Sequence, residues 1–306
     1  MRKAFVKTLI ELAEKDDRVY LLTGDLGFHA LEGFAEKFPE RFLNCGVAEQ
    51  NMMGVAAGLA LSGKKPYVYS IVPFVTLRCL EQIRIDVCYH NLDVKIIGIG
   101  GGFSYGTLGS THSVMEEMAI LRTIPNMSVF SPADLLETEE LFLKTYENKN
   151  PAYFRLSNIG QYEVYDKNPN LEIGKPNVVK DGADGVIVAT GLMVSICLDI
   201  IKKIKNENNI NLKLLSVHTV KPLDEKLLME QISDFKKIFV IEEHSVIGGL
   251  GSIVAEVLAD SGYGGILKRV GMDDEFLKEI GTADYLRAKH IVKKNGAIED
   301  ILNYFK

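Results

Sequence analysis

The feature that most constrains the fold is a repeated alternation between short apolar runs and longer segments with helical periodicity. Continuous apolar runs of strand length lie at 18–23, 66–72, 94–99, 127–131 and 152–156. Segments with apolar residues at helical spacing come before and between them, over 5–13, 47–62, 73–90, 113–123 and 133–147. Strands that are apolar throughout are usually buried on both faces. The pattern therefore predicts a mainly parallel sheet with helices on both sides.

The same alternation starts again in the second half of the chain, after a polar break. Between Leu156 and Asp184 the sequence contains many Asn, Lys and Pro residues and lacks the periodicity of a packed element. Further strands are predicted near 185–189, 212–217, 237–242 and 266–270, with helical segments between them. We therefore expect an α/β protein with two three-layer α/β/α domains and mainly parallel sheets. The first domain covers 1–160, a linker covers 161–184 and a smaller domain covers 185–306.

Composition and charge exclude several classes of protein. The 306 residues are enough for two domains with a core each. The 41 acidic residues outnumber the 35 Lys and Arg, so the net charge of −6 offers no basic surface to a nucleic-acid backbone. No apolar run approaches the roughly 18 residues needed to cross a bilayer, and the N-terminus does not resemble a signal peptide. We expect a soluble, cytoplasmic protein that binds neither nucleic acid nor membrane.

The cysteines point away from disulfides and structural metal. The chain has four, Cys45, Cys79, Cys88 and Cys197, and they form no CxxC pair. No histidine lies at zinc-ligand spacing from any of them. We expect all four to be reduced and mostly buried.

One acidic residue stands at the head of a helix that is otherwise apolar or small on every side. The segment 44–60 reads NCGVAEQNMMGVAAGLA, and Glu49 is its acid. Such a helix must be buried, and a buried carboxylate is costly to ionise unless another group meets it. Glu49 is therefore a candidate proton-shuttling group. From position alone, the simpler alternative is a first-turn Glu that complements the helix dipole.

Other candidate residues follow the ends of predicted strands, where open α/β sheets bind ligands. Asp25 and His29 come after the run at 18–23. Phe74 comes after the run at 66–72, at the start of a helix whose first turn contains Pro73. The alternatives are turn or capping roles for Asp25 and His29, and core packing for Phe74.

Two glycine-rich segments and one histidine complete the candidates. The run GIGGG at 98–102 follows a strand, but Phe103 takes the third glycine position of a dinucleotide-binding turn, so a loop that needs glycine backbone angles is the alternative. This loop leads to His112, where a helix is expected to begin and where a structural role is also open. The segment 242–252, EEHSVIGGLGS, either binds an anion at a helix N-terminus or forms a turn for close packing.

Taken in this order, the segments resemble the carboxy-terminal half of transketolases, and above all the small subunit of transketolases encoded as two chains. The resemblance covers nearly the whole sequence. Its most specific parts are GVAEQN at 46–51, Thr111-His112 with LRTIPNM at 121–127, TVKPLD at 219–224 and EEHSVIGGLG at 242–251. It implies a thiamine diphosphate pyrimidine-binding domain over 1–160 and a transketolase C-terminal domain over 185–306.

The resemblance implies thiamine diphosphate as the cofactor and assigns four residues to its binding. Glu49 matches the acid that hydrogen-bonds the pyrimidine ring nitrogen and drives the imino tautomer, which removes the proton from the thiazolium carbon. Phe74 matches the aromatic residue that stacks on the pyrimidine. Asp25 matches an acidic residue that lines the same cleft, and Ile71 is counted with them as a cofactor contact.

The resemblance also assigns substrate contacts and shows departures among them. His112 matches the histidine near the reactive carbon, where it donates to a substrate oxygen as charge develops, and Arg2 matches a residue that holds sugar phosphate. Gly100 stands in place of a family histidine and His29 in place of a serine. These departures predict an atypical sugar, unphosphorylated or nucleotide-linked, with His29 as a replacement contact. The alternative is that Arg2, Lys3 or a partner chain restores phosphate binding.

The family's diphosphate and magnesium site is missing from this sequence. Its signature is Gly-Asp-Gly followed by paired Asn, whereas here Asp25 is followed by Leu26 and Asn51 by Met52. Magnesium needs oxygen ligands beside the diphosphate. The resemblance therefore implies no metal ligands in this chain and an N-terminal transketolase subunit that supplies the Mg²⁺ ligands. The expected assembly is an α2β2 heterotetramer with a β–β dimer, active only with that partner.

The leading interpretation is a transferase subunit that moves a two-carbon ketol unit from a ketose donor to an aldehyde acceptor. The alternatives are the beta subunit of a 2-oxoacid dehydrogenase, a deoxyxylulose phosphate synthase-like enzyme and a catalytically silent scaffold of the same fold. Thr111-His112 and the tail motif disfavour the first, and the missing half disfavours the second. The presence of Glu49 and His112 disfavours the third. The sequence names neither donor nor acceptor.

Overall fold

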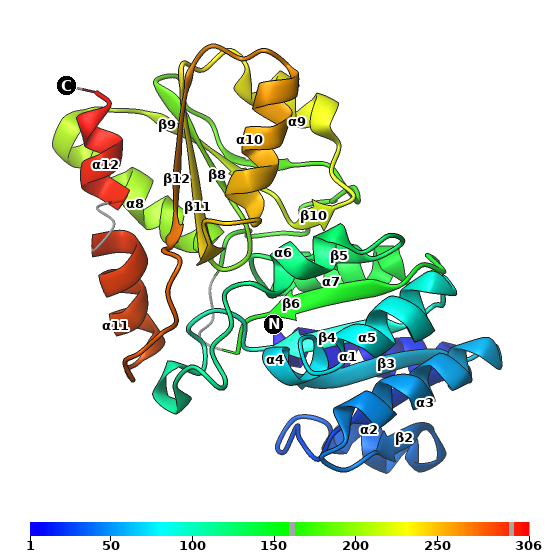
Figure 1. Cartoon of the computed structure of the whole chain (residues 1–306). Coiled ribbons are helices and arrows are strands. Elements are labelled where there is room, and N and C mark those ends of the chain that lie inside the picture. The colour runs from blue at the N-terminus through cyan, green and yellow to red at the C-terminus, as the bar shows by residue number, and fades with distance from the viewer. Residues whose placement is uncertain (159–162, 294–296, 306) are drawn as a thin grey trace.

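The computed structural model describes residues 1–158, 163–293 and 297–305, which form two sheets flanked by helices (Figure 1). Both sheets are mainly parallel, which confirms the predicted α/β fold class. The expected boundary at residues 160 and 161 lies outside the described residues. No helix in the described ranges is both long enough and apolar enough to cross a lipid bilayer.

Among the described residues, seven strands form the first sheet. In spatial order they are β10 (Thr219–Lys221), β5 (Ser128–Phe130), β6 (Ala152–Leu156), β4 (Lys95–Ile99), β3 (Lys65–Ile71), β1 (Val19–Thr23) and β2 (Phe42–Asn44). β10 pairs antiparallel with β5, and the other neighbours pair in parallel. Because β2, β1, β3 and β4 are parallel neighbours, their carboxyl ends meet at one edge of the sheet.

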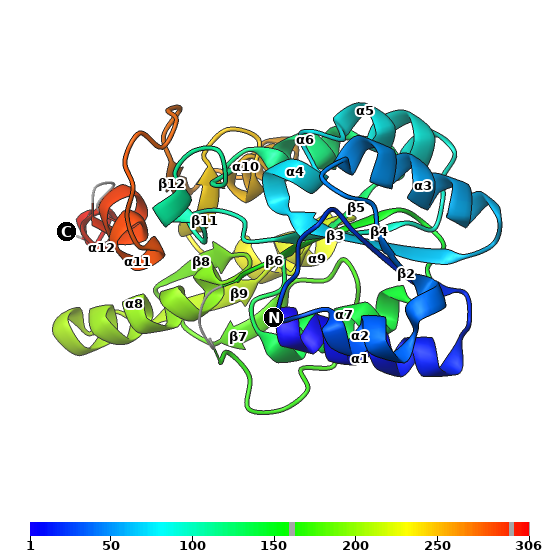
Figure 2. The ribbon, with the colours of Figure 1, turned by 90° about the horizontal axis from the view of Figure 1, so that it is seen from below.

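Helices cover both faces of the first sheet (Figure 2). One face carries α1 (Arg2–Lys15), α2 (Glu32–Lys37) and α7 (Leu135–Thr145), which share a buried apolar cluster with the strands. The opposite face carries α3 (Glu49–Leu61), α4 (Val72–Val75), α5 (Leu80–Gln82), a π-helical segment (Ile83–Tyr89) and α6 (Glu117–Thr123). Single 3-10 turns cover Pro39–Arg41 and Gly106–Leu108. This half is therefore a three-layer α/β/α unit.

The second sheet contains five strands within the described ranges. Their spatial order is β12 (Ile266–Met272), β11 (Lys237–Ser245), β8 (Gly185–Ala189), β9 (Leu212–Ser216) and β7 (Asn177–Lys180). β7 is antiparallel to β9, and the others are parallel. The helices are α8 (Met193–Asn208), α9 (Glu225–Ile232), α10 (Leu250–Asp260), α11 (Ala283–Arg287), a π-helical segment (Ala288–Lys293) and α12 (Ala297–Asn303). α9 and α10 pack on one face, and α8 and α12 on the other.

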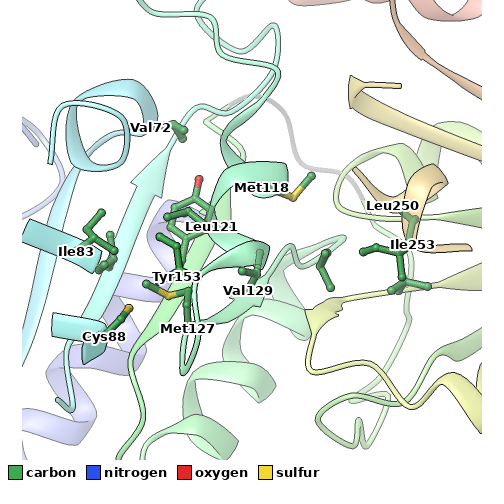
Figure 3. Packing of buried hydrophobic residues seen from close by; sticks show 14 of the residues in the cluster. Val72, Ile83, Cys88, Met118, Leu121, Met127, Val129, Tyr153, Leu250 and Ile253 are labelled. Carbon is green, nitrogen blue, oxygen red and sulfur yellow. The ribbon is translucent and has the colours of Figure 1, made fainter. Parts of the chain in front are cut away.

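The core on the α3 side continues from one sheet to the other. Met118 and Leu121 of α6 belong to the same buried cluster as Leu250 and Ile253 of α10 (Figure 3). Beside this cluster, Arg122 Nε donates to the carbonyl of Gly248 at 2.7 Å. The two halves are therefore joined by a continuous apolar core, with α6 and α10 at the junction.

The sequence pattern does not predict three short strands. β2 and β10 have three residues each, and β7 lies in the segment 161–184, where no packed element is expected. Strands of this length carry little periodicity of their own, so pairing with neighbours determines them. β10 also returns the chain from the second half to the edge of the first sheet.

The segment 73–90 is not the single helix that its periodicity predicts. α4 ends at Val75, a turn covers 76–79, and π-helical winding follows α5. Arg78 N donates to the carbonyl of Pro73 at 3.2 Å, a spacing of five residues instead of the α-helical four. In the same way, α6 begins at Glu117, so His112 lies in a turn and not at a helix start.

The composition of α3 predicts a helix that is buried on every side, and this prediction is wrong. One face packs on the sheet through Met52, Met53, Ala56 and Ala57, whereas the other face is exposed. Added Cβ atoms at Gly54 and Gly58 would meet no atom within 4 Å, and the nearby Leu61 is 68% exposed. Beyond Gln50 and Asn51, this face is small and apolar and leaves room for another helix.

Candidate functional site

The carboxyl ends of four neighbouring strands bring most of the candidate residues to one edge, which we call the first-sheet edge. Asp25 follows β1, and Asn44 ends β2. Glu49 begins α3 directly after β2, Phe74 follows β3 and His112 follows β4. Their spacing in the sequence is wide, but the parallel order β2, β1, β3, β4 places them in one region.

Glu49 lies in the first turn of α3 and is nearly inaccessible, with 2% of its side chain exposed. Its Oε2 accepts a hydrogen bond from Arg78 Nη1 at 2.7 Å. The backbone of Gly24 approaches closely, because a Cβ there would lie 3.3 Å from Glu49 Cγ. Burial and the neighbouring Glu49 charge together raise the pKa of Cys79 to about 12. Glu49 is therefore a buried acid that another group meets.

Phe74 contacts both His112 and Arg78, the residue that hydrogen-bonds Glu49. The guanidinium carbon of Arg78 lies 4.4 Å from the centre of the Phe74 ring. The His112 ring packs edge-on against the same aromatic ring, with 5.1 Å between centroids. Ile71, the half-buried last residue of β3, leads directly into α4, which carries Phe74. A carboxylate, an aromatic face and an imidazole thus lie within one connected group.

Asn44 organises the turn that carries Asp25. Its Oδ1 accepts hydrogen bonds from the backbone N–H of Asp25 and of Gly46, both at 3.0 Å. Its Nδ2 donates to Asp25 Oδ1 at 3.1 Å. Asp25 has a φ of 58°, a left-handed backbone that Asp tolerates better than most residues. Both side chains line a hollow of about 170 Å³.

Arg2 and His29 lie together in a different place. Both line a groove of about 440 Å³ along α1, with Lys3 and Lys7. Lys7 is paired with Glu139 at 3.2 Å. Tyr105 connects this groove with the first-sheet edge, since its ring lies 6.2 Å from that of His112 and the Arg2 charge lowers its pKa against the larger effect of burial. Arg2 and His29 therefore line a groove whose lining does not include Glu49.

The glycine run at 98–102 is a packing turn between the two halves. A Cβ at Gly101 would collide with Arg155, and one at Gly102 would collide with Glu243. Gly100 and Gly102 have φ values of 81° and 65°. The structure therefore shows a loop that needs glycine backbone angles, and not a dinucleotide-binding turn.

The segment 242–252 forms a contact within itself, between Glu242 and the start of α10. Glu242 accepts hydrogen bonds from the backbone N–H of Leu250 at 2.7 Å and of Gly251 at 2.8 Å. These donors belong to the first turn of α10, so the protein's own carboxylate occupies the position that an anion would take. Across the described residues, no group of three or more His, Cys, Asp and Glu side chains is arranged to hold a metal ion.

Sequence reasoning missed three residues of the first-sheet edge: Arg78, Asn44 and Tyr105. Arg78 lies in the predicted helix after the run at 66–72, four residues beyond the candidate Phe74, and Asn44 opens the segment 44–60 that contains Glu49. A search for side chains able to pair with a buried Glu49 would have included Arg78. Nothing in its sequence position shows that it reaches back over Phe74, because that depends on the turn at 76–79.

Comparison with known families covers most of the chain. Residues 1–159 match the family described as transketolase, pyrimidine binding domain. Residues 174–295 match the family described as transketolase, C-terminal domain. The chain belongs to the transketolase family. This confirms the resemblance stated from the sequence motifs, and with it the expected enzyme class, a transferase.

Relatives of similar length support the same assignment. The chain is 40% identical over 289 residues to a putative transketolase C-terminal section of Methanocaldococcus jannaschii, covering 94% of this chain and 90% of that protein. It is 37% identical over 290 residues to the 6-deoxy-6-sulfo-D-fructose transketolase subunit SqwH of Clostridium sp., covering 94% and 89%. Transketolase subunits of this kind therefore match along nearly their whole length.

A solved structure of the family has the same fold. The split gene transketolase described as an inactive beta4 tetramer superposes with a TM-score of 0.89 at 37% identity, covering 99% of this chain and 98% of that one. The 1-deoxy-D-xylulose-5-phosphate synthase of Halothermothrix orenii is 30% identical over 304 residues, but this transketolase-family chain spans 47% of its length.

Proposed function

We propose that this chain is the pyrimidine-binding subunit of a two-chain, thiamine diphosphate-dependent transketolase. The enzyme would move a two-carbon ketol unit from a ketose donor to an aldehyde acceptor. The observation that carries the proposal is the group formed by Glu49, Phe74 and His112 at the first-sheet edge, in a chain that belongs to the transketolase family.

The side chains present fit an aminopyrimidine. Glu49 supplies a buried carboxylate that can share a proton with a ring nitrogen. Phe74 is half-buried and supplies an aromatic face. Gly46, three residues before Glu49, has a φ of 70°, and an added Cβ there would meet no atom within 4 Å. Asp25 and Ile71 would line the same cleft.

Each residue has a separate task in this proposal. When bound, thiamine diphosphate supplies a carbon nucleophile that carries the ketol unit. Glu49 holds a proton at its carboxylate and so favours the basic form of the ring's amino group. Phe74 fixes the plane of the ring. His112 donates a hydrogen bond to a substrate oxygen as negative charge develops there.

The groove along α1 supports an anionic substrate group. Arg2, Lys3 and His29 gather at this groove, although Gly100 and His29 depart from the family's phosphate contacts. The relative from Clostridium is named for a sulfonated fructose. We therefore propose an atypical sugar that carries an anionic group, with Arg2 and His29 as contacts, and phosphate and sulfonate as the groups to compare. Steady-state kinetics with xylulose 5-phosphate, ribose 5-phosphate and sulfonated ketoses will rank them.

A partner chain completes the site in this proposal. The N-terminal transketolase subunit would supply the Mg²⁺ and diphosphate ligands. The exposed, small and apolar face of α3 supports a β–β dimer, and the similar split gene transketolase is described as an inactive beta4 tetramer. We propose an α2β2 heterotetramer that is active only when both subunits are present.

The domain division and the cellular location are part of the proposal. We assign 1–160 to the pyrimidine-binding domain, 161–184 to a linker that also supplies β7 to the second sheet, and 185–306 to the C-terminal domain, with β10 returning to the first sheet. A cytoplasmic location is supported by the cysteines, which are all described and form no disulfide. Cys79, Cys88 and Cys197 are buried, as predicted, and Cys45 is partly buried.

Reconstitution tests the proposed function. Calorimetry should show no tight, magnesium-dependent binding of thiamine diphosphate to the isolated chain. Addition of the N-terminal subunit should produce both binding and ketol transfer. Tight binding by the isolated chain would contradict the two-chain site. Decarboxylation of a 2-oxoacid with transfer of its acyl group to a lipoyl disulfide, which is reduced in the same step, would instead support the 2-oxoacid dehydrogenase alternative. A complex that binds the cofactor without turnover would support the silent scaffold.

A further inference from the structure

Arg78 contacts two of the residues that we propose for pyrimidine binding, Glu49 and Phe74. Its Nη1 donates to Glu49 Oε2 at 2.7 Å, and its guanidinium carbon lies 4.4 Å from the centre of the Phe74 ring. A guanidinium is planar, cationic and a hydrogen-bond donor. An aminopyrimidine bound to this chain would also be planar, stack on Phe74 and share a proton with Glu49. Both groups therefore use the Glu49 carboxylate and a face of the Phe74 ring.

We propose that Arg78 occupies the pyrimidine position of this subunit until the cofactor displaces it, and that Arg78 thereby sets how tightly the assembled enzyme binds the cofactor. The inference rests on the proposed function and extends it to a residue that the family resemblance does not assign.

The contact stabilises the free subunit because Glu49 is buried. A carboxylate with 2% exposure that lacks a partner is costly, and Arg78 supplies the hydrogen bond and the opposite charge. A second group that meets Glu49 would make Arg78 unnecessary. The pyrimidine is such a group, so the exchange of one partner for the other keeps the carboxylate hydrogen-bonded throughout.

The surroundings of Arg78 allow it to leave. Its side chain is 44% exposed, in contrast to that of Glu49. It extends from the turn between α4 and α5, and solvent can hydrate a displaced guanidinium. Glu49 cannot follow it, because the first turn of α3 and the backbone of Gly24 hold the carboxylate in place. Movement of Arg78 is therefore the simplest way to open the position.

The proposal predicts a cost to cofactor binding that removal of Arg78 abolishes. When only a fraction of the protein is competent to bind, the apparent dissociation constant rises by the inverse of that fraction. A competent fraction of about 10% corresponds to a roughly tenfold weaker apparent affinity. Truncation of Arg78 should therefore tighten cofactor binding about tenfold, in contrast to the loss expected for an ordinary binding residue.

The experiment is calorimetric titration of thiamine diphosphate, with Mg²⁺ present, into the reconstituted two-chain complex. Arg78→Ala should lower the dissociation constant about tenfold relative to wild type. Arg78→Lys keeps the charge without the planar group and should give an intermediate value. Arg18→Ala is the matched control, because Arg18 is 51% exposed and makes a 2.7 Å ion pair with Asp16 at the opposite end of β1. It should leave the dissociation constant unchanged.

A second readout identifies the position itself. In the Arg78→Ala complex, millimolar guanidinium chloride should weaken cofactor binding by occupying the vacated position, whereas equal sodium chloride should not. The wild-type complex should not distinguish the two salts.

The outcomes separate this inference from the proposed function. Unchanged or weaker cofactor binding in Arg78→Ala, with no effect specific to guanidinium, overturns the role of Arg78 and leaves the proposed function intact. A wild-type complex that binds no thiamine diphosphate overturns the proposed function, and this inference with it.

Discussion

The two sheets place similar residues at the carboxyl ends of their strands and use them differently. At the first-sheet edge, Glu49 is paired with a half-exposed arginine and His112 is only half-buried. At the end of β11, which we call the second-sheet edge, Glu242, Glu243 and His244 are each no more than 3% exposed. All three are engaged by surrounding protein. The difference teaches that a polar residue at a strand end is available to a ligand only where its partner can leave.

The second-sheet edge shows how the fold itself removes that availability. Glu243 accepts hydrogen bonds from Arg287 Nε at 2.5 Å and from the backbone N–H of Phe103 at 2.8 Å. Glu242 faces the N-terminus of α10, and burial nevertheless raises its pKa. Burial also lowers the pKa of His244 to about 4. Glu243 thereby connects the second sheet to the glycine run of the first.

The largest effect should come from Glu49→Gln in the reconstituted complex. An amide cannot share the proton that the proposed mechanism needs, so turnover should fall by about 10²–10⁴-fold. Proton exchange at the cofactor's thiazolium carbon, followed by NMR, should slow in parallel while assembly stays intact. The matched variant at the second-sheet edge, Glu242→Gln, should lower the melting temperature and leave that exchange rate unchanged. Unchanged exchange in Glu49→Gln would contradict the role of Glu49.

Arg287→Met should mainly affect stability. The substitution leaves the buried Glu243 carboxylate without its charged partner, and breaking a buried pair from one side typically costs about 3–5 kcal/mol. Urea unfolding of the isolated chain measures the change in free energy of unfolding. Lys175→Met is the control, because it breaks a surface pair with Glu172 and should leave the unfolding midpoint nearly unchanged. Equal effects of the two variants would show that the Arg287 contact contributes no more than a surface pair.

His112→Ala should lower kcat more than it weakens cofactor binding. The proposed hydrogen bond goes to the reacting substrate, and loss of one such donor typically costs about 2.7–4 kcal/mol in the transition state. Steady-state kinetics and calorimetry of the same preparation separate the two quantities. His244→Ala should give the opposite result, a lowered melting temperature with little change in kcat of the folded protein. A melting-temperature loss alone in His112→Ala would show a structural role.

The smallest effect should appear in the pH dependence of stability. His244 has a pKa of about 4 in the folded chain, below the ordinary 6.5, so the unfolded chain binds more protons between these values. Its contribution to stability is therefore complete above pH 6.5 and is lost as the pH falls to 4, by at most on the order of 3 kcal/mol. His218, also at about 4, acts in the same direction.

A buried carboxyl acts in the opposite direction and reduces the net change. Burial raises the pKa of Glu137 to about 7, so its contribution is complete below its ordinary value of 4.5 and is lost as the pH rises to 7. The variant His244→Asn removes the His244 imidazole. Urea unfolding at several pH values should therefore show a smaller loss of stability at acid pH in this variant than in wild type. Parallel pH curves for the two proteins would contradict the buried, neutral state of His244.

Much of the fold was accessible from the sequence because burial leaves a local pattern. β6 and β8 have the predicted bounds, since a short run of mainly apolar residues marks each of them. Glu49 was accessible as the one acid in a helix of mainly apolar and small residues, although the predicted burial of that helix on every side was wrong. β2, β7 and β10 were not, because three or four residues carry too little pattern and depend on the strands beside them.

The sequence by itself determined the two α/β halves, the transketolase motifs and the choice of Glu49, Phe74 and His112 as candidates. Only the tertiary structure decided that Arg78 lies on Glu49 and Phe74, that Arg2 and His29 share a separate groove, and that Glu242 caps α10. The physical reason is the separation along the sequence of the residues that interact. Hydrophobic periodicity is set by neighbours within a few residues, whereas the Glu49–Arg78 contact depends on parallel strand order and on a turn with five-residue spacing.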